Sequence, residues 1–288
     1  MRIVIVGAGG RLGMALVRKY SANFEVRSFR HEDLGLEHPD QIRERLRPLD
    51  FDLLINAAAL TNVDYCESHR NEAMAINAEA PGILAEVCQQ KNAKLIHLST
   101  DYVFDGRKRR PYSEQDTAIP LSVYGESKRE GEISVLGTSA RHLVVRVSWV
   151  FGPDRPSFVD QVIQRARETT DLAAIADKIA VPTYTLDLAD WLQTAWQHDL
   201  RGLLHLANGG ECSWQQYAQY AIDSCHRNGV ALKGKEVRPL CLSDMKNFVA
   251  ERPVYTVLST EKFVSETGKQ PRDWREAVAE YIERHLPK

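Results

Sequence analysis

The sequence predicts an α/β fold in which a doubly wound parallel sheet carries a smaller, mainly helical C-terminal lobe. Up to Phe151, short apolar segments alternate with segments of helical periodicity, and such alternation builds βαβ units with parallel strands. A cluster of glycines follows the first apolar segment directly. Beyond Phe151 the helical segments are separated by long stretches that contain glycine and proline, which indicates an added lobe.

The elements follow in order along the chain. The first strand is the β-branched run 2–6 (RIVIV), which ends at glycines, and a helix of regular apolar spacing follows at 12–20. Further strands of the sheet are predicted at 25–29, 53–56, 94–99 and 142–147. The helices between them are predicted at 41–46, at 72–90 and from near 122 through 132. In the second half, helices are predicted at 157–169, 185–197, 213–228 and 274–282.

The composition narrows the class of protein. With 288 residues the chain has room for about two domains, or for one domain with an added lobe. A net charge of −2 provides no basic excess for nucleic acid or anionic lipid. The apolar runs are too short to cross a membrane, and the five scattered cysteines form no CxxC pair. We therefore expect a soluble, cytoplasmic protein that has neither a disulfide framework nor a bound metal.

The glycine-rich segment GAGGRLG at 7–13 lies between the first strand and the first helix. Gly7 permits the tight turn, Gly10 lets backbone N–H groups approach a pyrophosphate, and Gly13 lets the helix pack closely on the strand. Together with Arg11 and Leu12 at the helix N-terminus, these glycines are predicted to bind a dinucleotide. A plain turn is the alternative, because turn glycines are common.

The residue that follows the second strand is expected to select the cofactor. An acidic residue there binds the ribose 2′-hydroxyl of NAD, whereas an arginine accommodates the 2′-phosphate of NADP. Arg30 occupies this place and favours NADPH. Glu32 and Asp33 lie close by and leave NADH open, and a purely surface role for Arg30 is the other alternative.

Two short segments carry the residues suited to chemistry. Tyr124 and Lys128 lie one helical turn apart on the same face. A nearby ammonium stabilises a phenolate and lowers the tyrosine pKa, so Tyr124 could deliver a proton to an oxygen while a cofactor delivers hydride to the adjoining carbon. Thr100, at the end of a predicted strand, could hydrogen-bond the same oxygen. The YxxxK spacing is common by chance, but its combination with the glycine loop and Thr100 predicts a reductase.

These segments make the chain resemble the extended short-chain dehydrogenase/reductases and, within them, the dTDP-4-dehydrorhamnose reductase family. The resemblance covers essentially the whole chain, and its most specific segments are STDYVFDG at 99–106 and NGGECSW at 208–214. The other segments that carry it are GAGGRLG at 7–13, INAAALTNVDYCE at 55–67, AINAEAP at 75–81, YGESKREGE at 124–132, RVSWVFG at 146–152, DKIAVPTYTLDLA at 177–189 and RPVYTVLSTEK at 252–262.

The resemblance implies a division into two domains. Residues 1–151 plus about 184–206 would form an NAD(P)-binding Rossmann domain, and about 152–183 and 207–288 would form the substrate-binding lobe. It also implies that Thr100, Tyr124 and Lys128 are the catalytic set, with Tyr124 protonating the C4 oxygen and Lys128 holding the nicotinamide ribose.

The resemblance assigns further residues to the cofactor and the sugar. The strand-end segment that passes under the cofactor is Asn56, Ala57, Ala58 and Ala59. The residues that pack the deoxysugar are Val63, Tyr102 and Trp149. Asn77 matches a structural, water-holding asparagine, or it serves helix packing.

The residues after Thr100 separate a reductase from its sister enzymes. Sugar-nucleotide 4,6-dehydratases that resemble this fold place Asp-Glu there, because eliminating water needs an extra acid and base. Here Asp101 and Tyr102 follow, which disfavours dehydration. Related 4-epimerases typically carry a serine-rich segment at this strand end, which also fits less well.

Three positions depart from the family pattern. Ala15 stands where some members carry an acidic residue that binds Mg²⁺ between subunits, which puts metal binding and that dimer mode in doubt. Lys178 replaces the glutamine of an Asp-Gln pair, and Gly35 replaces an expected aspartate. These changes affect cofactor preference, assembly or substrate detail more than hydride transfer.

The resemblance implies an NADPH-dependent reductase that takes dTDP-4-dehydro-L-rhamnose to dTDP-L-rhamnose. Reduction of another nucleotide-linked 4-ketohexose remains an alternative. A second alternative is a non-catalytic NADP-binding regulatory subunit that resembles the β subunit of methionine adenosyltransferase. The expected partners are a nucleotide-sugar substrate and a second copy of the chain in a homodimer, with neither nucleic acid nor membrane.

Overall fold

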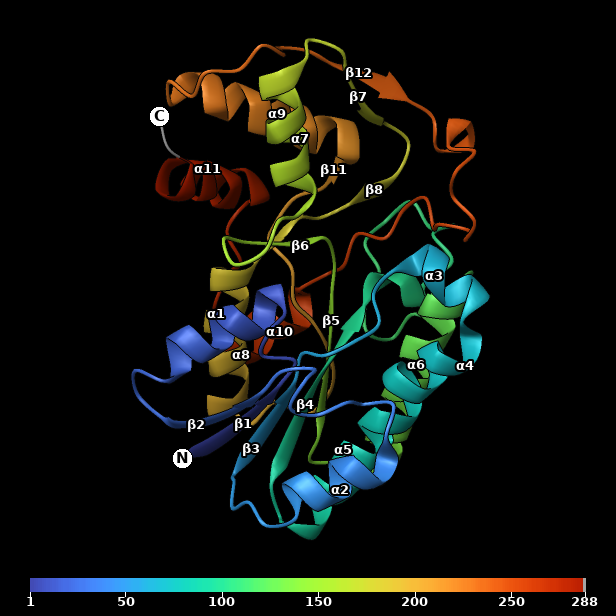
Figure 1. Cartoon of the computed structure of the whole chain (residues 1–288), viewed down its shortest axis with the longest axis vertical. Coiled ribbons are helices and arrows are strands. Elements are labelled where there is room, and N and C mark those ends of the chain that lie inside the picture. The colour runs from blue at the N-terminus through green and yellow to red at the C-terminus, as the bar shows by residue number, and fades with distance from the viewer. Residues whose placement is uncertain (287–288) are drawn as a thin grey trace.

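The computed structural model describes residues 1–286 and shows two parts joined end to end. A parallel sheet with helices on both faces forms the larger part, and a smaller lobe of helices and short strands lies beyond one end of it (Figure 1). Both the fold class and the added lobe agree with the prediction from sequence.

The strands of the main sheet are parallel and follow the order β10-β5-β4-β3-β1-β2. Their bounds are β1 (Arg2–Val6), β2 (Glu25–Phe29), β3 (Leu53–Asn56), β4 (Lys94–Thr100), β5 (Leu143–Val147) and β10 (Gly202–His205). The chain winds from β1 outward to β2 and then crosses to β3 on the other side of β1. This reversal places a crevice at the carboxyl ends of β1 and β3, where open α/β sheets bind ligands.

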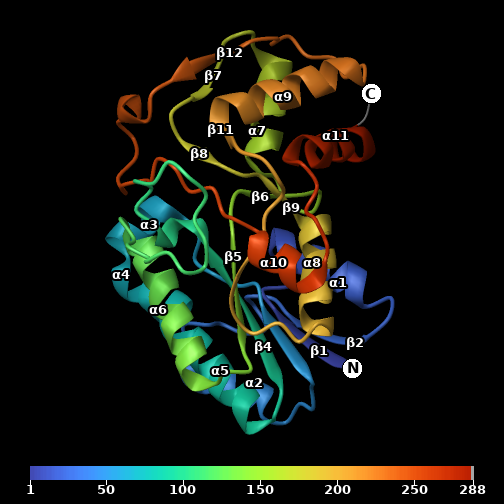
Figure 2. The ribbon, with the colours of Figure 1, turned by 180° about the vertical axis from the view of Figure 1, so that it is seen from behind.

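Helices cover both faces of the sheet, as Figures 1 and 2 show from opposite sides. One face carries α1 (Arg11–Tyr20), α8 (Thr185–Gln197) and α10 (Glu261–Thr267), and the other carries α2 (Pro39–Leu46), α5 (Ala80–Gln90) and α6 (Val123–Thr138). Leu16, Leu192 and Phe263 lie in the apolar core of the first face, and Leu84 and Val135 lie in that of the second. The inner strands β1 and β3 are buried from both sides, which explains their continuous apolar runs, whereas the edge strand β2 is largely exposed.

The helix expected at 72–90 is present as one continuous helical run from 70 to 90 that contains a π-helical turn. It consists of α4 (Arg70–Met74), the π-turn (Ala75–Glu79) and α5, and the separate short helix α3 (Val63–Ser68) precedes it. Such π-turns are often found at functional sites.

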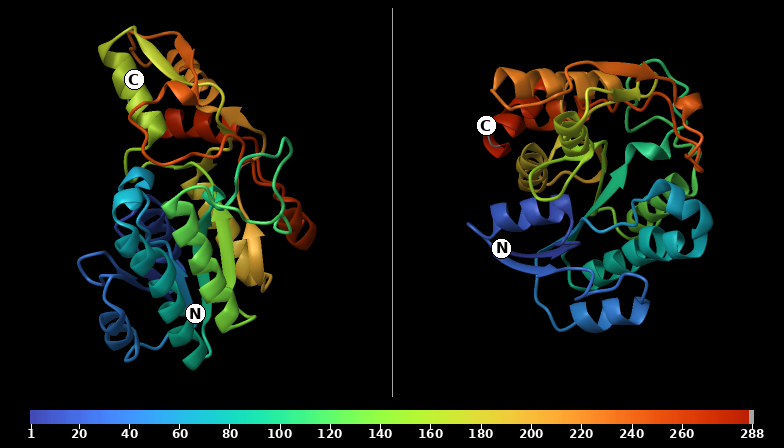
Figure 3. Two further views of the ribbon diagram at one scale, coloured as in Figure 1. Left: turned by 90° about the vertical axis from the view of Figure 1, so that its right-hand side faces the viewer. Right: turned by 45° about the horizontal axis from the view of Figure 1, so that its top comes forward.

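The lobe has its own apolar core, seen from two further directions in Figure 3. Its helices are α7 (Phe158–Glu168), α9 (Trp214–Arg227) and α11 (Trp274–His285). Its strand pairs are β7 (Leu172–Ile175) with β12 (Val237–Leu240), β8 (Ile179–Ala180) with β11 (Cys212–Ser213), and β6 (Val150–Phe151) with β9 (Thr183–Tyr184). Phe151, Tyr184, Tyr217 and Tyr281 pack ring against ring in this core.

One segment differs from the expected division of the chain. Residues 261–267 fall within the range 207–288 expected for the lobe, but α10 packs against α8 and β10 on the sheet. Its Phe263 is fully buried there. The chain therefore returns to the sheet twice after Phe151, once with α8 and β10 and once with α10.

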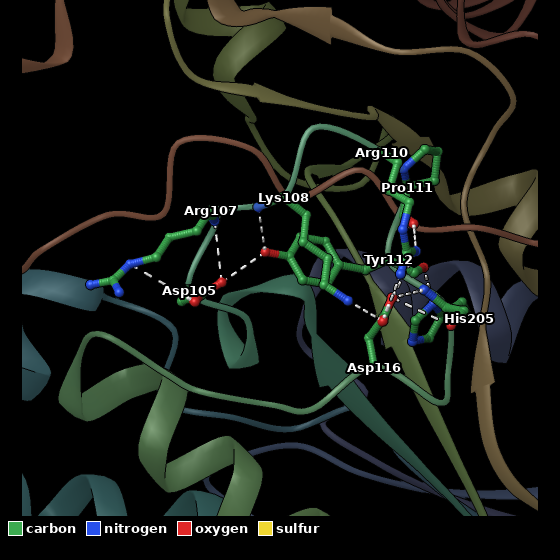
Figure 4. A network of polar contacts seen from close by, with 9 residues as sticks. Asp105, Arg107, Lys108, Arg110, Pro111, Tyr112, Asp116 and His205 are labelled. Atoms are coloured by element: carbon green, nitrogen blue, oxygen red, sulfur yellow. Dashed lines mark hydrogen bonds and ion pairs between the residues drawn. The ribbon is translucent and has the colours of Figure 1, made fainter.

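The basic run 107–110 forms ion pairs within its own loop (Figure 4). Lys108 and Arg110 both pair with Asp116. Tyr112 donates a hydrogen bond to Asp105 at 2.8 Å, and its carbonyl lies 3.1 Å from Nδ1 of His205 on β10. Asp105 and Asp116 therefore compensate part of the positive charge of this run.

No helix within residues 1–286 is both long and apolar enough to span a bilayer. The same residues contain no group of three or more histidine, cysteine, aspartate or glutamate side chains that could hold a metal ion.

Candidate active site

The glycine loop joins β1 to α1 and closes tightly on its neighbours. Gly7 has a φ of 84°, and a Cβ there would lie 2.5 Å from the backbone nitrogen of Ala58. A Cβ on Gly13 would overlap the Gly7 carbonyl. Gly10 is the N-cap residue of α1 and has no side chain that could hydrogen-bond the first N–H groups of the helix. These N–H groups therefore remain available to an anion.

Two adjoining cavities lie at the carboxyl ends of the strands and share Gly10 and Ala57–Ala59 as walls. The first measures about 430 Å³ and the second about 410 Å³. The first is lined by Gly10, Arg11, Leu12, Ala57, Ala58, Ala59, Thr61, Val63, Leu98, Ser99, Thr100, Asp101, Tyr102, Tyr124, Lys128, Val147, Trp149 and Val150. We call it the catalytic cavity, because it brings together every residue that the sequence assigns to catalysis or to the sugar.

The second cavity, which we call the adenosine cavity, continues from the glycine loop past the end of β2. It is lined by Gly7, Gly9, Gly10, Arg30, His31, Glu32, Leu34, Leu36, Glu37, Ala57, Ala58, Ala59, Leu60, Glu72, Ile76 and Arg155. Glu37 holds a buried Oε2 that has no hydrogen-bond partner among the described residues, so it is suited to accept from an amino or hydroxyl group of a ligand. The glycine cradle and this acceptor both fit the adenosine end of a dinucleotide.

Thr100 and Tyr124 lie close together because the turn that follows β4 packs closely against the first turn of α6. Thr100 ends β4, accepts a hydrogen bond from the backbone of Tyr102 at 3.2 Å and donates to Asp101 at 3.1 Å. Tyr124 lies in the first turn of α6, and a Cβ on Gly125 would overlap the Tyr102 carbonyl. Burial raises the pKa of Tyr124, and a hydrogen bond with Thr100 partly opposes that shift.

Lys128 takes a direction that the sequence did not predict. Its Nζ donates to the Leu98 carbonyl at 2.7 Å and lies 3.4 Å from Nε2 of His97. Burial lowers the pKa of Lys128 to about 8, and Glu132 opposes this shift. Among the described residues, the hydrogen-bond partners of the Lys128 Nζ are Leu98 and His97, and the hydrogen bond with Thr100 lowers the pKa of Tyr124 against the effect of burial.

The Asn56 side chain, at the end of β3, is held by two hydrogen bonds beneath the crevice. Its Oδ1 accepts from the backbone of Ala58 at 3.1 Å, which directs its Nδ2 toward Nδ1 of His97 at 3.1 Å. Asn56 and His97 are register partners on β3 and β4, and both are fully buried. A chain of polar contacts therefore runs from the strand end under the cofactor crevice to Lys128.

The three residues expected at the sugar line one wall of the catalytic cavity. The Tyr102 ring meets the Tyr124 ring edge to face at 5.7 Å, and Val63 packs with both. Trp149 adopts a left-handed backbone conformation with φ at 40°, and its buried Nε1 has no partner among the described residues. Strain and an unpaired donor at one residue are typical of a ligand site.

Two buried ionisable side chains, Asp101 and Lys178, lie behind Thr100, and the sequence analysis did not predict that they are neighbours. Asp101 accepts hydrogen bonds from Thr100 and Thr256, and burial raises its pKa. Lys178 donates to the Pro253 carbonyl at 2.6 Å, and its Nζ lies 4.8 Å from the centre of the Tyr102 ring. The signal in the sequence was the lysine in place of the family's glutamine, but its neighbours come from distant segments.

Comparison with known proteins supports this architecture. The model of the RmlD substrate binding domain family matches residues 1–286. The probable dTDP-4,6-dihydroxy-2-methyloxan-3-one 4-ketoreductase of Streptomyces antibioticus is 38% identical over 284 residues, 97% of this chain and 94% of the relative. The dTDP-4-dehydrorhamnose reductase of Mycolicibacterium smegmatis is 36% identical, over 98% of this chain and 85% of the relative. The solved dTDP-4-dehydrorhamnose reductase of Bacillus anthracis, in complex with NADP, matches with a TM-score of 0.92 and 29% identity over 98% of each chain.

Proposed function

The chain belongs to the RmlD substrate binding domain family, and from this premise we propose that it reduces dTDP-4-dehydro-L-rhamnose to dTDP-L-rhamnose with NADPH. The observation that carries the proposal is that Thr100, Tyr124 and Lys128 line one cavity, which adjoins the glycine loop. Full-length relatives named as dTDP-4-dehydrorhamnose reductases support the sugar, and the NADP complex of the Bacillus anthracis enzyme supports the cofactor.

Tyr124 is the proton donor in this proposal. Bound NADPH supplies the hydride that reduces C4. Because burial raises the pKa of Tyr124, its phenol keeps the proton at neutral pH until negative charge develops on the C4 oxygen. Transfer of that proton gives the C4 hydroxyl and leaves a phenolate, which is reprotonated from solvent before the next turnover.

Thr100 and Lys128 prepare this proton transfer. Thr100 is held by Asp101 and by the backbone of Tyr102, so its hydroxyl is fixed beside the Tyr124 phenol. Lys128 is anchored on Leu98 at the carboxyl end of β4, where it can reach a ribose hydroxyl of the cofactor and the phenolate formed by proton transfer. Its charge would then stabilise the phenolate at the one stage when this is needed.

Oxidation of NADPH by the purified protein tests the proposal. The substrate is enzymatically generated dTDP-4-dehydrorhamnose, and Tyr124→Phe is compared with the wild type. We expect rapid turnover in the wild type and a loss of about 10²-fold or more in the variant, the usual contribution of a general acid. NADPH binding by both proteins at equal affinity is the control for folding. Equal rates in the two proteins would rule out Tyr124 as proton donor.

Reduction of another nucleotide-linked 4-keto sugar is the second candidate. The Streptomyces antibioticus relative, a probable 4-ketoreductase of a different deoxysugar nucleotide, is 38% identical to this chain, which favours this candidate. Parallel assays with other dTDP-4-ketohexoses decide by the ratio of kcat/KM values. Tight NADPH binding with no turnover of any ketosugar nucleotide would instead support the regulatory alternative.

A further inference from the structure

The lobe contributes one cationic side chain to the adenosine cavity. Arg155 lies in the loop between β6 and α7, and its Nε donates to the Gly9 carbonyl at 2.6 Å. A Cβ built on Gly9 would lie 3.7 Å from Cγ of Arg30 and 3.9 Å from Nη2 of Arg155. Both arginine side chains therefore lie beside the same glycine, and both line the same cavity.

The loop that carries Arg155 is fixed against α1. Arg11 donates from Nε to the Arg155 carbonyl and from Nη1 to the Val150 carbonyl, each at 3.0 Å, and it also bonds the Pro156 carbonyl. Arg18 pairs with Asp154 in the same loop. Because the backbone is held on both sides of Arg155, its guanidinium is directed to the glycine loop at little further cost in conformational entropy.

The distribution of charge indicates where an anion would be bound. Within residues 1–286, the Nη atoms of Arg155 make no hydrogen bond or ion pair, and Arg30 pairs loosely with Glu32 at 3.8 Å. An exposed ion pair of this kind contributes little to stability, so a phosphate can replace Glu32 as the partner of Arg30. Glu37 and Glu72 also line the cavity, and these carboxylates suit the amino and hydroxyl groups of an adenosine rather than its phosphate.

We infer that Arg155 and Arg30 together bind the ribose 2′-phosphate of NADPH, so that the lobe takes part in selecting the cofactor. Arg155 lines the adenosine cavity with Arg30, whereas Arg11 and Leu12, at the helix N-terminus suited to the pyrophosphate, line the catalytic cavity. Two guanidinium groups present the planar donors that phosphate oxygens favour. The inference rests on the proposed use of NADPH, and it adds a specificity residue that comes from outside the Rossmann segment.

Equilibrium binding of NADPH and NADH, followed by the fluorescence of the reduced nicotinamide, tests the inference without any turnover. We expect Arg155→Ala to raise the Kd for NADPH by about tenfold or more and to change that for NADH by less than about twofold. Arg155→Lys should recover part of the affinity, and Arg30→Ala should show the same selectivity for NADPH. Arg18→Ala is the matched control, because it loosens the same loop through Asp154 without removing a charge from the cavity.

The outcomes separate this inference from the proposed function. If the wild type binds NADPH and Arg155→Ala weakens NADPH and NADH equally, or weakens neither, Arg155 does not recognise the 2′-phosphate and the inference is overturned while the reductase proposal stands. If the wild type binds neither cofactor, the proposed function itself is contradicted. Selective loss of NADPH binding in Arg155→Ala but not in Arg18→Ala supports the inference.

Discussion

Two lysine side chains are buried close to Thr100 and Tyr124, the proposed catalytic residues, and burial lowers the pKa of each lysine to about 8. Lys128 faces the crevice and is placed to meet a cofactor. Lys178 lies behind Tyr102 and near Asp101, where no solvent reaches it. The two ammonium groups therefore lie on two sides of the site. Lys128 is the one proposed to contact the cofactor, and Lys178 lies near the buried Asp101 carboxyl.

Removal of Lys178 should change how stability depends on pH. The folded chain releases the Lys178 proton near pH 8, whereas the unfolded chain keeps it to about 10.5, so this residue makes the free energy of unfolding rise between those values. Between pH 8 and 10.5, we expect the free energy of unfolding of the wild type to rise by about 2–3 kcal/mol relative to that of Lys178→Met. Urea titrations at several pH values measure the difference, with Lys235→Met as the control at an exposed lysine. Parallel curves for wild type and Lys178→Met would contradict the buried ammonium.

At the scale of elements, the π-helical turn Ala75–Glu79 orients Asn77 toward two segments at once. Asn77 accepts from the backbone N–H of Leu60 at 2.9 Å, and it donates to the Leu60 carbonyl at 3.0 Å and to Ser127 at 3.1 Å. Ser127 lies on α6 between Tyr124 and Lys128. The Asn77 side chain thus joins the loop after β3, which lines both cavities, to the helix that carries Tyr124 and Lys128.

Replacement of this side chain should affect both stability and rate. We expect Asn77→Ala to lower the free energy of unfolding by about 2 kcal/mol, because it leaves polar groups of Leu60 and Ser127 without partners. The value of kcat should fall as well, since α6 loses its link to the crevice. Urea unfolding and steady-state kinetics measure the two effects, with Asn71→Ala on the exposed side of the preceding turn as control. Unchanged stability in Asn77→Ala would show that the contacts contribute no net energy.

The elements that the sequence predicted correctly are those with a local signal. The strands at 2–6, 25–29 and 53–56 have the predicted bounds, and the clearest local signal is the β-branched run 2–6, which ends at a glycine. The short helix α10 and the π-turn were not predicted, because α10 is only seven residues long and a π-turn has the same apolar spacing as a helix.

The same distinction holds for the candidate site. The glycine loop, Thr100 and the Tyr124–Lys128 pair can each be identified from a short sequence motif, and the structure brings them to one crevice. Arg155 and Lys178 could not be assigned a role from sequence, because each acts on a partner far away in the chain. The direction of Lys128 depends on His97 and Leu98 of another strand, which no helical spacing reveals.

At the scale of the whole molecule, the crevice lies where the sheet and the lobe meet, and charged contacts hold the two parts together. Arg18 on α1 pairs with Asp154 of the lobe, and Arg272 pairs with Asp187 on α8. On the opposite side, Asp64 on α3 binds the strap formed by residues 249–252. Asp64 directly follows Val63, so this contact lies next to the sugar side of the catalytic cavity.

The Asp64 contact is expected to set the affinity for the sugar nucleotide. Its Oδ1 accepts from the backbone of Val249 and Ala250 at 2.8 and 2.9 Å, and Arg252 donates to its Oδ2 at 2.6 Å. The hydrogen bonds from Arg252 lower the pKa of Asp64 to about 2, so the carboxylate stays charged at any pH above that value and the contact weakens only in strong acid. A neutral side chain of the same shape should therefore release the strap at neutral pH.

Asp64→Asn should raise the KM for the sugar nucleotide by about three- to tenfold with little change in kcat, because Tyr124 and Thr100 do not depend on the strap. Trypsin should also cut faster after Lys246, which lies just before the strap. Steady-state kinetics and timed digestion measure the two effects, and Glu251→Gln, an exposed change inside the strap, is the matched control. Faster digestion with an unchanged KM would mean that Asp64 holds the strap in place but that the strap does not contribute to binding of the sugar nucleotide. A fall in kcat at constant KM would mean instead that the strap acts on the catalytic residues themselves.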